Sequence, residues 1–240
     1  ISSDTSGAGH AGTVTVQAAS ALLDSQGVTA VETGIYSEAY AGTGASGHVQ
    51  VSVEQELRIA GQAYVSSSTY TDADAGTVRV QAGSLWVGSG GRKDSQPGIF
   101  SDTYRGAGHA GEVTVNVRDL LEMSSYGMIS STTYAQGNAG VVTVTAGRMV
   151  LDGTGSEAGY TGIFAQTDGG TGHAGGVSVT VGADLTLSNG AGISSSNLNA
   201  SEGNAGSVNV SVGGRLQVLS GSEISSDTSG AGHAGTVTVQ

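Results

Sequence analysis

The chain has 240 residues, of which 42 are glycine, one is proline and none is cysteine. Its 20 acidic and 8 basic residues give a formal net charge of -12 at pH 7. This charge argues against binding to nucleic acid or to anionic membranes, and no apolar run approaches the ~18 residues of a membrane span. The lack of cysteine excludes disulfides and thiolate metal sites.

The two ends of the chain are identical in sequence. Residues 1–17 read ISSDTSGAGHAGTVTVQ, and residues 224–240 read the same. Because a shared fold fixes a pattern but leaves surface residues free, this identity indicates one period of a longer array. We therefore expect residues 1–240 to form a single shaft segment without a domain boundary. It would consist of one super-repeat, residues 1–223, and an overlap, residues 224–240.

A motif Ala/Ser-Gly-x-Val-x-Val recurs eight times, and long and short spacings alternate between its glycines. Repeats of about 20–50 residues are typical of solenoids, in which each unit buries its apolar face against its neighbours. The motif glycines are Gly12, Gly47, Gly76, Gly111, Gly140, Gly175, Gly206 and Gly235.

Valines that alternate with polar residues in this motif predict a strand with one buried face. The first valine of each motif should stack on the first valine of the next, which would give a core ladder along the repeat. Its members are Val14, Val49, Val78, Val113, Val142, Val177, Val208 and Val237.

Two more strand-like pieces follow in each unit, such as Leu57-x-Ile59 and Ile99-x-Ser101. Three short strands per unit and no helical period predict an all-β fold, a right-handed parallel β-helix of about seven to eight coils. The handedness follows from the chirality of parallel crossovers. A β-propeller is the alternative, but its blades need roughly 40–50 residues and four antiparallel strands, and the units of this chain are too short for that.

Long and short units differ in the connection between the second and the third strand. In a long unit it runs from Leu85 to Ile99, whereas in a short unit it runs only from Leu57 to Val65. Every second coil should therefore carry a loop, at residues 24–34, 88–98 and 152–162. Two coils advance roughly 10 Å along the axis, so the loops should form one ridge along the shaft.

Asn, Asp and His dominate the column two residues before the motif glycine. These are the non-glycine types most enriched in the left-handed backbone conformation, so we expect a column of turns. A metal-binding column is the alternative, although no two consecutive coils both carry His. The column comprises His10, Ala45, Asp74, His109, Asn138, His173, Asn204 and His233.

Aromatic residues follow the inward Ile of the third strand in the long units. Tyr36, Phe100 and Phe164 should point outward by alternation, and Trp86 is outward on the second strand of a long unit. One interpretation is that the loops fold back over these rings. The other is an apolar stripe for contact between fibres or with a ligand. The candidates to help in the covering are Val28, Val31, Pro97 and Tyr160.

A second aromatic row occupies one column in four successive coils. Its members are Tyr40, Tyr70, Tyr104 and Tyr134. Rings at the interstrand spacing of ~4.8 Å should stack and stabilise this corner.

Catalysis needs clustered carboxylates or a base near a cleft, and the acids of this chain are scattered. In the nearest thing to an acidic column, the acids lie two or more coils apart, which is too far for a paired acid and base. We therefore expect no enzyme, no catalytic residues, no cofactor and no metal site. The column comprises Glu38, Ser68, Asp102, Thr132, Gln166, Ser196 and Asp227.

Residues 203–228 (GNAGSVNVSVGGRLQVLSGSEISSDT) and 75–91 (AGTVRVQAGSLWVGSGG) resemble the repeats of filamentous-haemagglutinin-like adhesins. These adhesins are large exoproteins of two-partner secretion systems, and the resemblance covers all seven units. It implies a right-handed β-helix shaft, export across a bacterial outer membrane, and an extracellular or cell-surface role in adhesion or biofilm. The amino-terminal secretion domain that defines the family is not among these residues.

The sequence therefore predicts a structural shaft of an extracellular bacterial fibre or adhesin, supporting cell adhesion, aggregation or a biofilm matrix. Its expected partners are further copies of the repeat along the fibre axis, in the same chain or head to tail. Neighbouring fibres, a host surface and polysaccharide are further candidate partners. The alternative function is a carbohydrate-binding module that uses the aromatic stripe.

Overall fold

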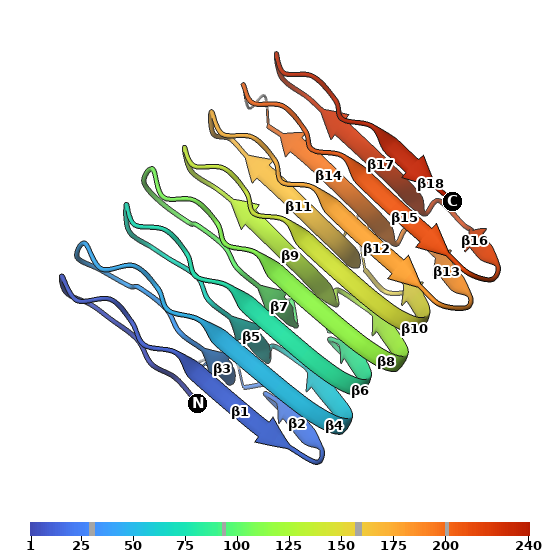
Figure 1. The fold of residues 1–240 in the computed structure, drawn as a ribbon, viewed down its shortest axis with the longest axis horizontal. Coiled ribbons are helices and arrows are strands. Elements are labelled where there is room, and N and C mark those ends of the chain that lie inside the picture. The colour runs from blue at the N-terminus through green and yellow to red at the C-terminus, as the bar shows by residue number, and fades with distance from the viewer. Residues whose placement is uncertain (29–31, 93–94, 157–159, 200–201) are drawn as a thin grey trace.

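The computed structural model describes residues 1–240 except 29–31, 93–94, 157–159 and 200–201. The described residues wind into a parallel β-solenoid of about seven turns (Figure 1). This confirms the predicted all-β parallel β-helix. No helix among the described residues has the length and the apolar character to cross a membrane.

Eighteen strands lie in the part of the chain that the structure describes. In chain order they are β1 (Val14–Ala18), β2 (Ala21–Asp24), β3 (Gly34–Tyr36), β4 (Val49–Ala60), β5 (Tyr64–Ser66), β6 (Val78–Gly88), β7 (Gly98–Phe100), β8 (Val113–Ser124), β9 (Met128–Thr133), β10 (Val142–Asp152), β11 (Gly162–Asp168), β12 (Val177–Val181), β13 (Leu185–Ser188), β14 (Gly192–Leu198), β15 (Val208–Val212), β16 (Leu216–Val218), β17 (Glu223–Thr228) and β18 (Val237–Val239).

These strands form two parallel sheets. The wide sheet follows the order β1-β4-β6-β8-β10-β12-β15-β18, with β2, β13 and β16 paired at its side. The narrow sheet follows the order β17-β14-β11-β9-β7-β5-β3. Each coil contributes to both sheets, and its apolar side chains meet between them.

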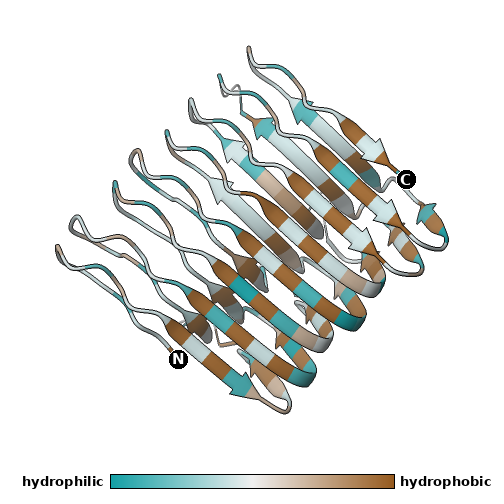
Figure 2. Ribbon diagram, in the orientation of Figure 1, coloured by the Kyte–Doolittle hydropathy of each residue, from teal (hydrophilic) through white to brown (hydrophobic). Residues whose placement is uncertain are grey.

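The pairing register is the one that the repeat predicts. Val14 pairs with Val49, and the same alignment continues through every coil to the pair of Val208 and Val237. The core ladder is buried from Val14 to Val208. Val237, on the last strand of the sheet, is 40% exposed. Figure 2 shows the result as apolar bands that alternate along the strands and lie beside those of the next coil.

The prediction of three separate strands per coil was wrong for four coils. In β4, β6, β8 and β10 the first two predicted pieces are one continuous strand of 11 or 12 residues. The ladder shifts register once within these strands, for example between Val53 and Glu56. A β-bulge bends a strand without ending it, so the corner needs no loop.

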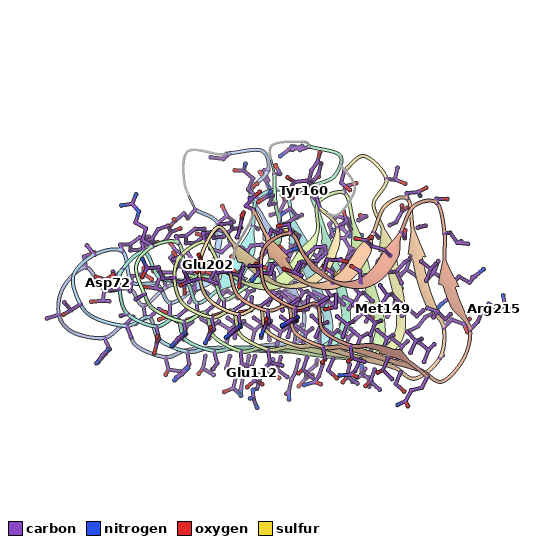
Figure 3. The ribbon with its side chains drawn as sticks, turned by 90° about the horizontal axis from the view of Figure 1, so that it is seen from above. Asp72, Glu112, Met149, Tyr160, Glu202 and Arg215 are labelled. Carbon is purple, nitrogen blue, oxygen red and sulfur yellow. The ribbon has the colours of Figure 1, made fainter. Side chains whose placement is uncertain are left out.

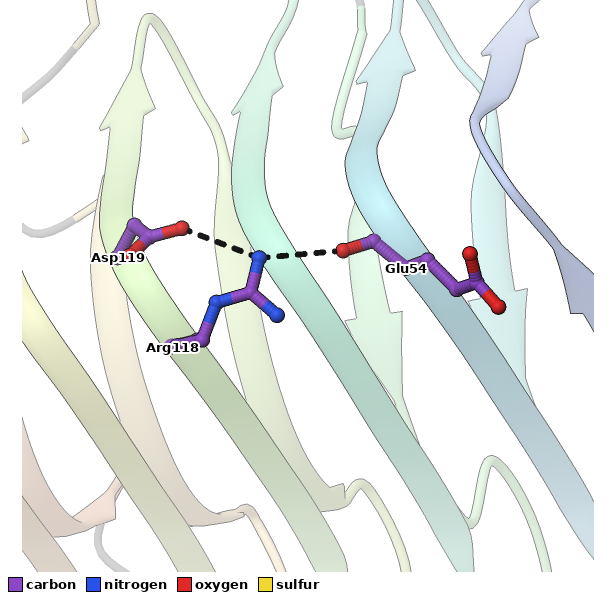
Figure 4. A network of polar contacts seen from close by, with 3 residues as sticks. All are labelled: Glu54, Arg118 and Asp119. Carbon is purple, nitrogen blue, oxygen red and sulfur yellow. Dashed lines mark hydrogen bonds and ion pairs between the residues drawn. The ribbon is translucent and has the colours of Figure 1, made fainter.

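Arg118 links coils at this bulged corner (Figure 4). Its Nη2 donates to the backbone oxygen of Glu54 at 3.3 Å and lies 3.3 Å from a carboxylate oxygen of Asp119. The side chain crosses the coil between them at Gly83, where an added Cβ would come within 2.8 Å of Nη2. The missing side chain of Gly83 therefore makes room for this contact.

A serine clamp closes the corner between the narrow sheet and the motif glycine. Ser101 Oγ accepts a hydrogen bond from Gly111 N at 2.9 Å and donates to Gly76 O in the preceding coil at 2.7 Å. One hydroxyl thus satisfies backbone groups of two coils. The clamp recurs at Ser37, Ser67, Ser131, Ser195 and Ser226.

The motif glycines are required by the spacing between coils. From the second motif onward, an added Cβ would lie only 1.8–2.3 Å from the carbonyl oxygen of the preceding motif glycine. No side chain fits at such a distance, so the recurrence of glycine follows from stacking.

The Asn, Asp and His column forms a hydrogen-bond ladder. His109 N donates to Asp74 Oδ1 at 2.8 Å, and Asn138 N donates to His109 Nδ1 at 2.9 Å. The predicted left-handed backbone was wrong, because none of these residues has a positive φ. These residue types serve here as side-chain acceptors for the backbone of the next coil.

Candidate functional site

The outer face of the narrow sheet forms the floor of a groove. Two cavities of about 470 and 460 Å³ lie along it, and both are lined by Gln96, Phe100 and Tyr104. Because these residues are shared, the two cavities adjoin in the direction in which the coils stack. We call this continuous feature the axial groove.

Strand alternation builds the floor. In β9, Ile129 points into the core while Ser130 and Thr132 point to the groove, and the register carries both positions to the neighbouring strands. The floor therefore alternates hydroxyl side chains with aromatic, acidic and amide side chains in the same columns, such as Ser130 between Phe100 and Phe164. Its hydroxyl members are Ser66, Ser68, Ser130, Thr132, Ser194 and Ser196.

The loop side supplies one wall of the groove. Glu32, Gln96 and Tyr160 contribute to its lining. Figure 3 shows Tyr160 among the loops that stand out from the stacked coils. Its side chain is 44% exposed, so the wall presents part of an aromatic ring.

The predicted tyrosine column forms the other wall. The ring centroids of Tyr40 and Tyr70 lie 5.6 Å apart, those of Tyr70 and Tyr104 4.6 Å, and those of Tyr104 and Tyr134 5.3 Å. The interplanar angles are 15°, 11° and 4°. Stacking is thus confirmed, and it holds four rings in line along the groove.

Burial acts on the tyrosine hydroxyls as well. It raises the pKa of Tyr70 to about 12, with the charges of Glu38 and Glu32 adding to the shift. Burial also raises the pKa of Tyr40, Tyr104 and Tyr134. These phenols keep their protons and can donate hydrogen bonds.

The predicted aromatic stripe is divided between two places. Phe164 is 3% exposed, and an added Cβ at Gly162 would lie 2.8 Å from its ring. Phe100 covers Gly98 in the same manner, with its ring 2.3 Å from an added Cβ. Both rings pack against glycine backbone on the groove floor. Phe164 is buried there, whereas Phe100 is half-buried.

Tyr36 and Trp86 differ from the two phenylalanines. Tyr36 packs against Tyr64 with 5.5 Å between ring centroids. Trp86 lies on the wide sheet, where the guanidinium carbon of Arg58 sits 3.6 Å from its ring centroid. The four aromatic residues therefore do not form a single exposed stripe.

The loop residues cover these rings only in part. Pro97 is buried, whereas Val28 is 48% exposed. Val31 lies outside the described residues.

Two acidic residues of the groove, Glu38 and Asp102, belong to the column that the sequence predicts to form no functional site. The structure instead buries both, with Glu38 3% and Asp102 4% exposed. Outward positions normally reach solvent, and here the walls of the groove enclose them. Only the assembled loops and tyrosines create this environment, so the sequence pattern gave no signal for it.

Burial governs the protonation of both groups. It raises the pKa of Glu38 to about 7, against the opposing hydrogen bond from Ser66. It likewise raises the pKa of Asp102 to about 7, against hydrogen bonds from Thr132 N and the Tyr104 hydroxyl, and the charge of Glu38 adds to the rise. Near neutral pH a large share of each carboxyl group is therefore uncharged.

The hydrogen bonds of the two carboxyl groups differ. Asp102 accepts from Thr132 N at 2.8 Å and from the Tyr104 hydroxyl at 3.4 Å. Glu38 Oε1 accepts from Ser66 Oγ, but its buried Oε2 has no hydrogen-bond partner among the described residues. The nearby Tyr40 hydroxyl donates to Glu32 instead.

Among the described residues, no three His, Asp or Glu side chains come together in a way that could hold a metal ion. No protein-family model, no curated protein and no solved structure matches the chain. The geometry of the groove and of the stacked coils therefore carries the functional argument.

Proposed function

We propose that the chain is a structural shaft segment of an extracellular bacterial fibre or adhesin, which supports cell adhesion, aggregation or a biofilm matrix. The proposed role is mechanical and involves no catalysis. One observation carries the proposal. The same 17-residue sequence pairs with the coil after it at one end of the chain and with the coil before it at the other end.

Residues 1–17 pair with the coil that follows them, as in Val14 with Val49. Residues 224–240 pair with the coil that precedes them, as in Val237 with Val208. A coil of this sequence thus has a complementary partner on each face. The shaft can continue with the same unit in either direction, and further copies of the repeat are its natural partners.

The length of the repeat fits a rigid spacer. Seven coils at ~4.8 Å advance roughly 34 Å per super-repeat. Each coil adds the same two columns of valine, and most coils repeat the serine clamp, so the stacking contacts continue as the shaft grows. Such a spacer holds a terminal binding region away from a cell surface.

Two further features support an extracellular setting. The net charge of -12 keeps neighbouring shafts apart and soluble, and the repeats resemble those of secreted adhesins. Both features support the proposed extracellular localisation.

The test uses cells that produce the full-length protein and cells from which internal super-repeats have been deleted in frame. We expect surface labelling in both strains, with shorter fibres and weaker cell-to-cell or surface adhesion in the deleted strain. Retention of the protein inside the cell, or adhesion that is independent of fibre length, would contradict the proposal.

A further inference from the structure

We propose that the axial groove binds an uncharged polysaccharide chain that lies along the fibre axis. This proposal goes beyond the shaft role and does not depend on it. It rests on the shape of the groove, on the chemistry of its floor and on one unpaired carboxyl oxygen.

The shape of the groove favours an extended ligand. Ligand sites commonly have volumes of ≈ 300–1,000 Å³, and each of the two adjoining cavities reaches this size with about 470 and 460 Å³. Together they follow the stacking direction between two straight walls. A polymer can occupy both cavities at once, whereas a compact ligand would fill one.

The floor offers partners for sugar hydroxyls. Its serine and threonine hydroxyls both donate and accept hydrogen bonds. Phe100 packs over Gly98 and stays partly exposed, so it offers aromatic surface to the apolar side of a sugar ring. Alternating hydroxyl and aromatic contacts match the two kinds of surface that a pyranose chain carries.

Glu38 gives a specific reason to expect a ligand. Its side chain is buried, with only 3% exposed, and it lines the second cavity. Its Oε2 has no hydrogen-bond partner among the described residues, and a buried polar atom left unpaired is unfavourable. A ligand hydroxyl in the groove would satisfy this oxygen.

The charge of the groove selects against acidic polymers. Its lining includes Glu32, Asp168, Glu223 and Asp227, and among the described residues it contains no Lys or Arg. A polyuronate would meet repulsion along the whole groove. The buried pair Glu38 and Asp102 favours a neutral partner, because burial stabilises the protonated form of both.

A peptide strand fits less well. Peptides that add to a sheet need a free edge with unpaired backbone groups. The groove floor is the face of a sheet whose strands β5 to β14 each pair on both sides. Recognition must therefore come from side chains, as it does for a glycan.

The test is native gel electrophoresis of the 240-residue protein in gels that contain one soluble polymer each. The uncharged probes are hydroxyethyl cellulose, galactomannan and dextran, and the charged probe is polygalacturonate. We expect at least one uncharged polymer to retard the protein, and polygalacturonate not to do so.

Matched variants locate the binding. Ser130→Trp fills the groove floor and should weaken binding at least tenfold. Thr114→Trp places the same ring on the outer face of the wide sheet in the same coil and should leave binding unchanged. Circular dichroism shows whether each variant folds. Phe100→Leu is the second groove variant, in case Ser130→Trp does not fold. It removes the aromatic ring but keeps an apolar side chain at this position, and it should weaken binding severalfold.

The proposal is overturned if no uncharged polymer retards the protein. It is also overturned if polygalacturonate alone retards it, or if folded groove variants bind as well as the unchanged protein. Loss of binding in Thr114→Trp alone would also overturn the proposal, because it would place the binding site on the outer face of the wide sheet.

Discussion

Gly175 and Gly176 form a matched pair that tests the stacking geometry. They are adjacent in one corner, yet an added Cβ at Gly175 would lie 1.8 Å from Gly140 O and 2.5 Å from Gly140 C. At Gly176 the nearest atom, Ser207 O, is 3.4 Å from the added Cβ, which is an ordinary contact. We predict that Gly175→Ala is strongly destabilising and that Gly176→Ala is nearly neutral.

The magnitude follows from two costs at Gly175. Overpacking against backbone that cannot turn away costs about 1–3 kcal/mol. The shift also disturbs the hydrogen bond from Ser195 Oγ to Gly175 O, which is 2.7 Å long, at a further cost of about 1 kcal/mol. A loss of about 3 kcal/mol should lower the melting temperature by roughly 6–12 °C in a domain of this size.

The assay is urea and thermal unfolding followed by far-ultraviolet circular dichroism, with both variants measured beside the unchanged protein. Gly176→Ala should melt within about 2 °C of the unchanged protein, because Gly→Ala at a compatible site changes stability by less than about 1 kcal/mol. Equal melting temperatures for the two variants would refute the close approach of motif glycines in successive coils.

Three further predictions concern the clamp, the groove and the core. Ser131→Ala removes the acceptor for Gly140 N and the donor to Gly111 O, and should lower the free energy of unfolding by about 1–3 kcal/mol; an unchanged urea midpoint would contradict the clamp. Burial raises the pKa of Glu38 to about 7, so the stability it confers is complete below its unfolded pKa of 4.5 and is lost as the pH rises through about 7. Glu38→Gln should therefore flatten the fall in melting temperature between about pH 5 and pH 8, and an equally steep fall in this variant would contradict the assignment. Val144→Asp places an unpaired charge at a fully buried position and should cost at least about 3 kcal/mol; an unchanged melting profile would contradict the core ladder.

The fold could be predicted because its determinants recur in the sequence. The valine columns, the Ile column that includes Ile99 and the spacing of the motif glycines each repeat with the coil, and stacking in register follows directly from them. The tyrosine stack was predictable for the same reason. Each of these features depends only on which residues occupy equivalent positions.

The remaining features depend on contacts between coils, and these contacts cannot be read from which residues occupy equivalent positions in the repeats. The sequence pattern placed Ser101 only within the third strand-like piece of its unit, whereas its hydroxyl joins Gly111 to the preceding coil. The bulges of β4, β6, β8 and β10 were missed because one extra residue in a strand resembles a loop in the sequence.

The groove was the least predictable part. Glu38 and Asp102 lie at outward positions that would be exposed on an isolated sheet. Their burial comes from the tyrosine wall and the loop wall, which belong to different parts of each coil. Only the arrangement of the walls in space shows that each of the two carboxyl groups is buried in the axial groove.

The length of the protein tests the central claim most directly. The measurement is negative-stain electron microscopy of this chain beside a protein that carries one further super-repeat. We predict rods of equal width whose lengths differ by roughly 34 Å, which corresponds to seven coils at ~4.8 Å. A wider or globular particle, or an unchanged rod length, would contradict a shaft that grows by in-register stacking of its coils.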